Sequence, residues 1–79
     1  MILTGAKLEE IGKALYGDSW ALVLAGRLRK SRKTVWRWRD SERAIPPDLR
    51  GKLAELIDDQ LNTLSAHANE LREGVLDTP

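Results

Sequence analysis

The sequence predicts an all-α protein, and three observations carry that prediction. Apolar residues recur at intervals of three and four along most of the chain, which is the spacing of one face of an α-helix. β-branched residues are few, and no segment keeps up the alternation of apolar and polar residues that marks a strand. The chain has 79 residues, which is one domain at most. A chain of this size buries only about 60% of its unfolded surface, so we expect a small core.

The first two helices are expected to be short. Thr4 has the side chain to cap a helix over residues 5–16, and Asp18 or Ser19 can cap a second helix over 19–28. Helical spacing predicts their inward faces. These are Leu8, Ile11 and Leu15 on the first helix, and Ala21, Leu24, Ala25 and Leu28 on the second.

A third helix is expected from the N-cap Ser31 to about Arg39, after a turn of only three or four residues. Two helices so closely joined form a helix-turn-helix. After the loop "DSERAIPP", a proline at 46 or 47 suits the first turn of a fourth helix, where its missing N–H costs nothing. Apart from Gly51, nothing breaks the helical pattern from there to about Arg72, so this helix is expected to be long.

Charge is unevenly distributed, although the net charge is only +1. Residues 26–52 carry ten basic and three acidic side chains, whereas residues 53–79 carry one basic and six acidic. Seven of the thirteen lysines and arginines lie from Arg27 to Arg39, with no acidic residue among them. Such asymmetry indicates a basic face for a polyanion and an acidic remainder turned away from it.

The segment "LAGRLRKSRKTVWRW", followed by "IPP" and a leucine-bearing helix, resembles the Cro- and phage-repressor-type helix-turn-helix family, also called xenobiotic-response-element-like. The resemblance covers residues 4 to about 57. It implies a compact bundle of four or five helices and sequence-specific DNA binding, most often by a dimeric transcriptional repressor. In the turn, Arg29 stands where the family commonly has glycine and Lys30 where it has an apolar residue, and Ala21 replaces a frequent glutamine. A positive φ at Arg29 would therefore be strained.

The resemblance assigns the outer face of the third helix to the major groove of DNA, while Val35 and Trp38 share its buried face. Arginine forks onto guanine O6 and N7, and a tryptophan can pack on a thymine methyl or a sugar. The residues expected to read bases are Arg32, Lys33, Trp36 and Arg37. The expected phosphate contacts are Ser19 and Trp20 at the start of the second helix, together with Lys30, Ser31, Arg39 and Arg43.

Plainer interpretations stand beside this one. A run of charge is usually a solvated face, but Lys33 and Arg37 repel each other at i,i+4, and an anionic partner would offset that repulsion. The pattern therefore favours nucleic acid. Trp36 has the alternative of packing on the "IPP" loop instead of touching DNA. RNA is less favoured, because single-strand recognition needs several exposed aromatic rings and only Trp36 qualifies.

The long fourth helix is predicted to serve both the core and a dimer. Its first turns carry Leu49, Leu53, Leu56 and Ile57, which can pack on the bundle. Beyond them a coiled-coil seam is predicted through Ala54, Ile57, Leu61, Leu64, Ala68, Leu71 and Val75. We expect a homodimer interface of Ile57, Leu61, Leu64, Ala68 and Leu71, since homo-oligomers usually close as two-fold dimers. The alternative is a helix that bends back as a fifth helix over its own core.

These patterns predict a DNA-binding domain over residues 1–57, a dimerisation extension over 58–75 and a flexible tail over 76–79. We expect a phage or mobile-element regulator that represses at an inverted-repeat operator in double-stranded DNA, including that of its own operon. The alternative is an antitoxin-like module whose C-terminal helix binds a partner protein.

Other classes find little support in the sequence. The absence of cysteine excludes a disulfide framework, and the lone His67 has no companion ligands, so neither a metal nor a cofactor is expected. No nucleophile stands with a base, so an enzyme is not expected. The N-terminus turns polar within a few residues, and no apolar run approaches the ~20 residues needed to span a bilayer. We expect a cytoplasmic protein without membrane contact.

Overall fold

The computed structural model describes residues 2–73, and every regular element in that range is helical. These elements are α1 (Gly5–Tyr16), a 3₁₀ turn η1 (Gly17–Ser19), α2 (Trp20–Leu28), α3 (Arg32–Arg39) and α4 (Leu49–Glu73). The all-α prediction and the long C-terminal helix are therefore confirmed. Val75 of the predicted seam and the predicted tail over 76–79 lie outside the described residues.

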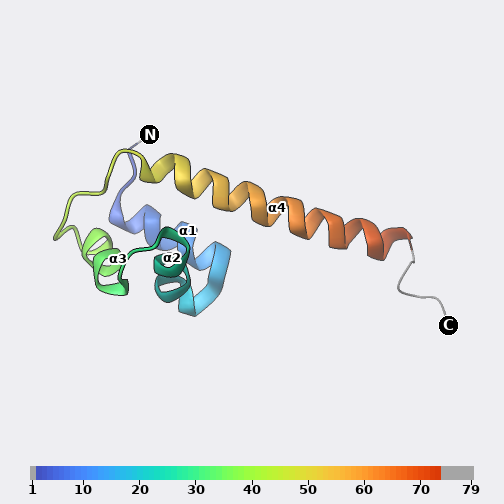
Figure 1. Cartoon of the computed structure of the whole chain (residues 1–79), viewed down its shortest axis with the longest axis horizontal. Helices are drawn as coiled ribbons and strands as arrows, with labels where there is room; N and C mark the ends of the chain where they lie inside the picture. The colour runs from blue at the N-terminus through green and yellow to red at the C-terminus, as the bar shows by residue number, and fades with distance from the viewer. Residues whose placement is uncertain (1, 74–79) are drawn as a thin grey trace.

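The compact bundle contains three helices, not the four or five that were expected. α1, α2 and α3 pack against one another, while α4 crosses the bundle with its first half and then projects beyond it (Figure 1). A compact chain of this length would have a radius of gyration of about 12 Å. The observed value is 15.7 Å, because α4 projects. α4 is one continuous helix and does not bend back as a fifth helix.

Side-chain caps set where α1 and α3 begin, as the sequence predicted. The Oγ1 atom of Thr4 accepts a hydrogen bond from the Lys7 N–H at 3.1 Å. Ser31 Oγ accepts one from the Thr34 N–H, also at 3.1 Å. Each cap satisfies an N–H group that has no partner inside its helix, so both helices start at a defined residue.

α4 begins later than the prolines predicted. The Pro46 carbonyl accepts a hydrogen bond from the Leu49 N–H at 3.1 Å, so the prolines form a turn ahead of the helix instead of its first turn. Leu49 and Leu53 are buried, and Leu56 and Ile57 are half-buried. Beyond Ile57, every residue up to 73 is exposed except the half-buried Ala68. The helix therefore changes from a core element into a surface element after its first turns.

All four helices contribute to one core, made of Leu8, Trp20, Ala21, Leu24, Ala25, Val35, Trp38, Leu49 and Leu53. Two glycines let α1 approach its neighbours closely. A Cβ atom at Gly5 would overlap the Arg39 carbonyl, and one at Gly12 would overlap the indole ring of Trp20. α1 therefore lies directly against α2 and α3, and it fixes how the helix-turn-helix is held.

Candidate nucleic-acid interface

α3 presents a buried face and an open face. Val35 and Trp38 are 0% and 3% exposed, which fixes the helix on the bundle as predicted. Arg32 and Lys33 are exposed and Arg37 is half-exposed. With 3.6 residues per turn, Lys33 and Arg37 leave the helix on the side opposite Val35 and Trp38, while Arg32 leaves its first turn at the flank between the two faces. The predicted base-reading cations thus share a surface that the bundle does not cover.

The turn before α3 has the conformation in which glycine is favoured, although the residue there is Arg29. Its backbone is left-handed, with φ 56° and ψ 43°, a conformation that costs about 1–2 kcal/mol for a residue with a Cβ atom. The N–H of Lys30 donates to the Ala25 carbonyl at 2.9 Å, and that of Arg29 donates to Gly26 at 3.3 Å. These are the two hydrogen bonds of a Schellman C-cap. The tight turn therefore forms without glycine.

Lys30 lies at the edge of the core. It lines a small cavity of about 130 Å³ together with Leu28, Trp38 and Leu49, and the residue is still exposed to solvent. A lysine in such a place covers apolar surface with its methylenes and leaves its ammonium in water. The side chain thus replaces an apolar residue at the core edge and still offers a charge.

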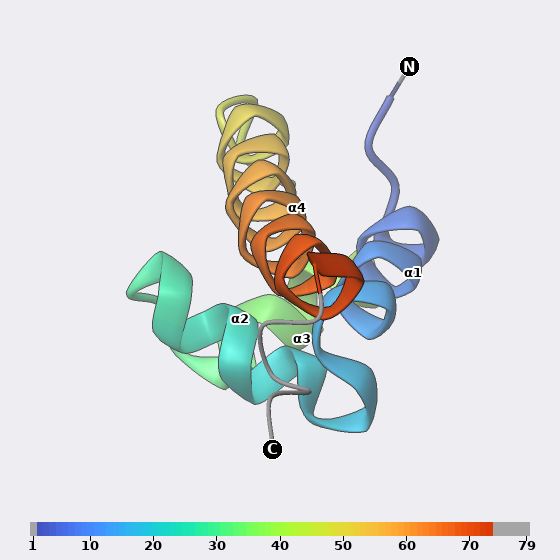
Figure 2. The same cartoon turned by 90° about the vertical axis from the view of Figure 1, so that its right-hand side faces the viewer.

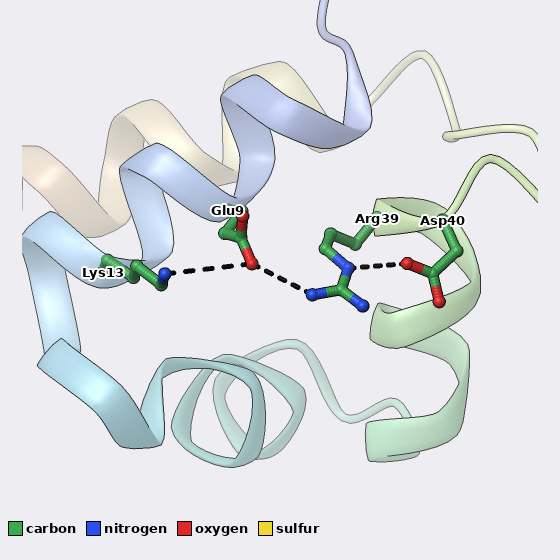
Figure 3. A network of polar contacts seen from close by, with 4 residues as sticks. All are labelled: Glu9, Lys13, Arg39 and Asp40. Atoms are coloured by element: carbon green, nitrogen blue, oxygen red, sulfur yellow. Dashed lines mark hydrogen bonds and ion pairs between the residues drawn. The ribbon is translucent and has the colours of Figure 1, made fainter.

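Arg39 was expected to contact phosphate, but two carboxylates hold it (Figure 3). Its Nη1 lies 3.0 Å from Glu9 Oε2, and its Nε lies 2.7 Å from Asp40 Oδ1. Lys13 Nζ approaches the same Glu9 oxygen at 4.0 Å. The hydrogen bonds to Asp40 and then to Glu9 raise the pKa of Arg39 above its already high ordinary value. A phosphate would have to compete with both carboxylates, so this arginine joins α1 to α3 instead.

Trp36 is half-buried, not on the outside where it was expected. Its ring meets that of Trp20 edge-on, with the ring centroids 5.4 Å apart and the planes at 69°. The guanidinium of Arg39 lies 4.4 Å from the Trp36 centroid. The predicted packing alternative was the "IPP" loop, whereas the observed partner is the first residue of α2. Contact with a base is therefore limited to the part of the ring left free.

The predicted phosphate contacts at the starts of α2 and α3 differ in whether their hydrogen-bond donors are still free. Trp20 is 2% exposed and its backbone N–H donates to the Gly17 carbonyl, so neither its side chain nor that N–H is free for a phosphate. Ser19 is exposed, and its side chain makes no capping hydrogen bond. Ser31 caps α3 and also lies 2.9 Å from Thr34 Oγ1, so its hydroxyl is engaged within its own helix.

Cations near the turn and α3 make no ion pair in residues 2–73, as Arg50 and Arg72 on α4 also do not, whereas three lysines on α1 and α4 do. Lys7 and Lys13 on α1 and Lys52 on α4 each pair with a carboxylate. Within residues 2–73, no carboxylate lies within 4.0 Å of the following side chains: Arg27, Arg29, Lys30, Arg32, Lys33, Arg37 and Arg43. Arg43 is exposed in the loop after α3. The positive charge of this group, which we call the open cations, is therefore not neutralised by the described part of the chain.

Leu22 is a surface residue that the sequence did not single out. It is 57% exposed on α2, and it lines a shallow pocket with Ser19, Arg32 and Trp36. The signal was present, because Leu22 stands off the inward positions of its helix. An exposed leucine beside two predicted base-reading residues adds an apolar contact to the same surface.

The predicted dimer residues lie along one side of α4. Leu61, Leu64 and Leu71 are 59%, 55% and 62% exposed, while Ile57 and Ala68 are half-buried. Between α1 and α4 runs an apolar groove of about 270 Å³, lined by Ile11, Ala14, Leu15, Ile57, Gln60, Leu61 and Leu64. Figure 2 shows α1 beside α4 when the molecule is viewed from the C-terminal end of α4. The apolar surface thus continues from α4 onto α1, which the sequence did not predict.

No family model, curated protein or solved structure matches this chain. Among the helices of residues 2–73, none is long and apolar enough to cross a membrane. The same residues contain no group of three or more His, Asp or Glu side chains placed to hold a metal ion. The case for a function therefore rests on the surfaces of the chain itself.

Proposed function

We propose that the chain is a sequence-specific DNA-binding regulator of transcription, a repressor that binds an inverted-repeat operator as a homodimer. The observation that supports this most is the group of open cations around the turn and α3, which have no carboxylate partner in residues 2–73. Duplex DNA supplies the missing negative charge, with one phosphate about every 1.7 Å of its axis. The earlier resemblance to phage-repressor-type regulators agrees with this function.

Double-stranded DNA fits the surface better than single-stranded nucleic acid. The major groove admits an α-helix, and α3 has one face free of the bundle. Single strands are bound on exposed aromatic rings. Trp20 and Trp38 are buried, and Trp36 is half-buried against Trp20. The described residues therefore offer a helix for a groove but no row of rings for unpaired bases.

The structure narrows the contacts that we propose. Arg32, Lys33 and Arg37 read bases, with Leu22 and the free edge of Trp36 offering apolar contact. Phosphate contacts come from the remaining open cations and from Ser19. Arg39 is removed from the set because two carboxylates hold it. The interface is thus centred on α3 and its preceding turn.

The test is selection of bound sites from random duplex DNA, with the chain's own promoter region included. Arg37→Ala is expected to lower affinity for the selected site by about 5- to 150-fold and to relax preference at one base step. Arg50→Ala removes the same charge from exposed α4 and should leave sequence preference unchanged. Affinity should fall steeply with salt, by about 0.9 in log–log slope for each phosphate contact. A flat salt response, or equal effects of the two variants on preference, would overturn the proposal.

A second candidate is an antitoxin-like interaction module, and the three exposed leucines of α4 favour it. The same surface would then hold a different protein. Light scattering of the pure chain and of Leu64→Asp separates the two functions. A dimer that Leu64→Asp converts to a monomer with weak operator binding supports the regulator. A monomeric chain whose C-terminal half associates non-specifically supports the interaction module.

A further inference from the structure

The projecting half of α4 has an uncovered apolar side that continues onto α1. Leu61 and Leu64 border both this exposed side and the groove that Ala14 and Leu15 line on α1. Leu71 continues the same side toward the end of the helix. We propose that a second copy of the chain covers this surface, with the two α4 helices antiparallel and the partner's Leu71 packed at the groove. The inference rests on the proposed homodimer and assigns its geometry.

Heptad positions fix the register of such a pair. Along the seam, Leu61 and Ala68 occupy one core position of the heptad, and Leu64 and Leu71 the other. Antiparallel helices place one kind of core position opposite the other kind. Leu61 then packs against the partner's Leu71, and Leu64 against the partner's Ala68. The two-fold axis repeats both contacts, so all four residues are covered.

Charges beside the seam select this direction. In the antiparallel register the flanking residue Asp58 lies beside the partner's Arg72, and the two-fold axis makes this contact twice. Asp58 has no ion pair in residues 2–73, and Arg72 donates only a 3.5 Å hydrogen bond to Asn69. A parallel pair would instead place His67 beside the partner's Arg72, and no opposite charges would meet. Charge complementarity thus favours antiparallel helices.

The length of α4 gives a second argument. Each bundle is anchored on α4 through Leu49 and Leu53. In the proposed register the two Leu53 residues are 26 helical steps apart, which is about 39 Å. Successive major grooves on one side of DNA are about 34–36 Å apart. A parallel pair would bring both bundles to the same end of the dimer, whereas the antiparallel pair separates their anchors by about one groove repeat.

Cysteine cross-linking tests the direction. The chain has no cysteine, so one introduced residue is the only thiol. In the antiparallel pair the two copies of residue 61 lie about 15 Å apart along the helices, too far for a disulfide, which needs Cα atoms within about 7 Å. Leu61→Cys and Leu71→Cys chains should each stay uncross-linked alone and form a covalent dimer when mixed and mildly oxidised. Ala66→Cys, on the outer side of α4, sets the background.

If the Leu61→Cys chain forms a covalent dimer with itself, the two helices are parallel. If the yield of covalent dimer from the mixture does not exceed the yield from Ala66→Cys, the helices do not pair along this seam. Either result overturns the inference.

A charge exchange provides an independent measurement by sedimentation equilibrium. Asp58→Arg and Arg72→Asp should each weaken the dimer about 2- to 30-fold, and the double variant should restore it. Asp59→Arg, one residue outside the flank, is the matched control. A double variant as weak as the single variants would contradict the pairing.

These results are separable from the proposed function. An antiparallel cross-link in a chain that binds no DNA would refute the function and leave the geometry standing. Salt-dependent operator binding by a dimer with parallel cross-links would support the function and refute the antiparallel geometry. DNA binding and cross-linking are therefore measured on the same preparations.

Discussion

The α1–α3 bundle and the projecting half of α4 differ in how far they bury their apolar side chains. In the bundle, leucines and tryptophans from three helices meet in one core with Leu49 and Leu53 from the start of α4, and the Glu9–Arg39 contact joins α1 to α3. In the projecting half, Leu61, Leu64 and Leu71 are more than half exposed. An isolated helix of modest length is only marginally stable in water without tertiary packing. The bundle therefore buries its apolar side chains within one chain, whereas the end of α4 leaves three leucines uncovered, which supports the proposed dimer.

The two regions also differ in charge. The open cations gather around α3, whereas residues 53–79 carry six acidic side chains and one basic one. Acidic residues are repelled by a phosphate backbone, and basic residues are attracted to it. The charge pattern thus orients the chain, with α3 toward a polyanion and the projecting helix away from it. This difference supports the proposal that the surface around α3 binds nucleic acid and that the end of α4 binds protein.

The largest difference is expected when a leucine is truncated in each region. Leu24 is 0% exposed in the core, so Leu24→Ala should lower the free energy of unfolding by about 2–5 kcal/mol. Leu64→Ala should cost less than about 1 kcal/mol in dilute protein, because water already reaches much of this side chain. At high concentration the cost should grow, since dimerisation then contributes to stability. Urea unfolding at two protein concentrations measures both effects.

Equal losses for the two variants in dilute protein would break the contrast. They would mean that Leu64 is covered within a single chain, and α4 would then belong to the core along its whole length. The m-value provides a control, because it should stay the same in both variants if the unfolded state is unchanged.

A smaller effect is expected in the turn of the helix-turn-helix. Arg29 has φ 56°, so Arg29→Gly should relieve strain and stabilise the bundle by about 0.5–1 kcal/mol after the added flexibility of the unfolded chain is counted. The matched control is Arg27→Gly, which removes the same charge from within α2 and should destabilise by about 1 kcal/mol. Thermal unfolding distinguishes the two by opposite shifts in Tm. A loss of stability in both variants would mean that the arginine side chain itself supports the turn.

Local features of this fold were predictable from the sequence, and contacts between distant residues were not. The caps at Thr4 and Ser31 depend on neighbours three residues away, so residue type and spacing suffice to predict them. The buried face of α3 follows from helical periodicity in the same way. The contact between Glu9 and Arg39 joins residues thirty positions apart, and no local pattern marks it.

The site was predicted in part for the same reason. The cationic outer face of α3 follows from periodicity, whereas the loss of Arg39 and Trp20 from the contact set depends on tertiary partners. Trp36 was expected outside because its helix position points away from Val35, but the start of α2 lies close enough to cover part of its ring. The sequence therefore predicts which residues share a face, and the packing of helices decides which of them remain available.

The smallest effect on stability is expected from substitution of Glu9, the carboxylate on α1 that pairs with Arg39 on α3. Glu9→Gln removes one of the two carboxylates that hold Arg39 and leaves the 2.7 Å contact with Asp40. The loss of stability should be slight, because solvent screens this partly exposed pair. DNA affinity at low salt should rise, since a negative charge is lost near α3 and Arg39 becomes freer to reach phosphate. The log–log salt slope should steepen by up to about 0.9 per subunit if that contact forms.

The matched control is Glu10→Gln, which makes the same charge change on the same helix but pairs only with Lys7 and is far more exposed. Affinity measured for both variants across a salt series separates a general loss of negative charge from the release of Arg39. A steeper slope in Glu9→Gln alone indicates that the α1–α3 contact withholds a cation from DNA. Equal slopes in the two variants would show that Asp40 is sufficient to hold Arg39, and the Glu9 contact would then serve only to position α3.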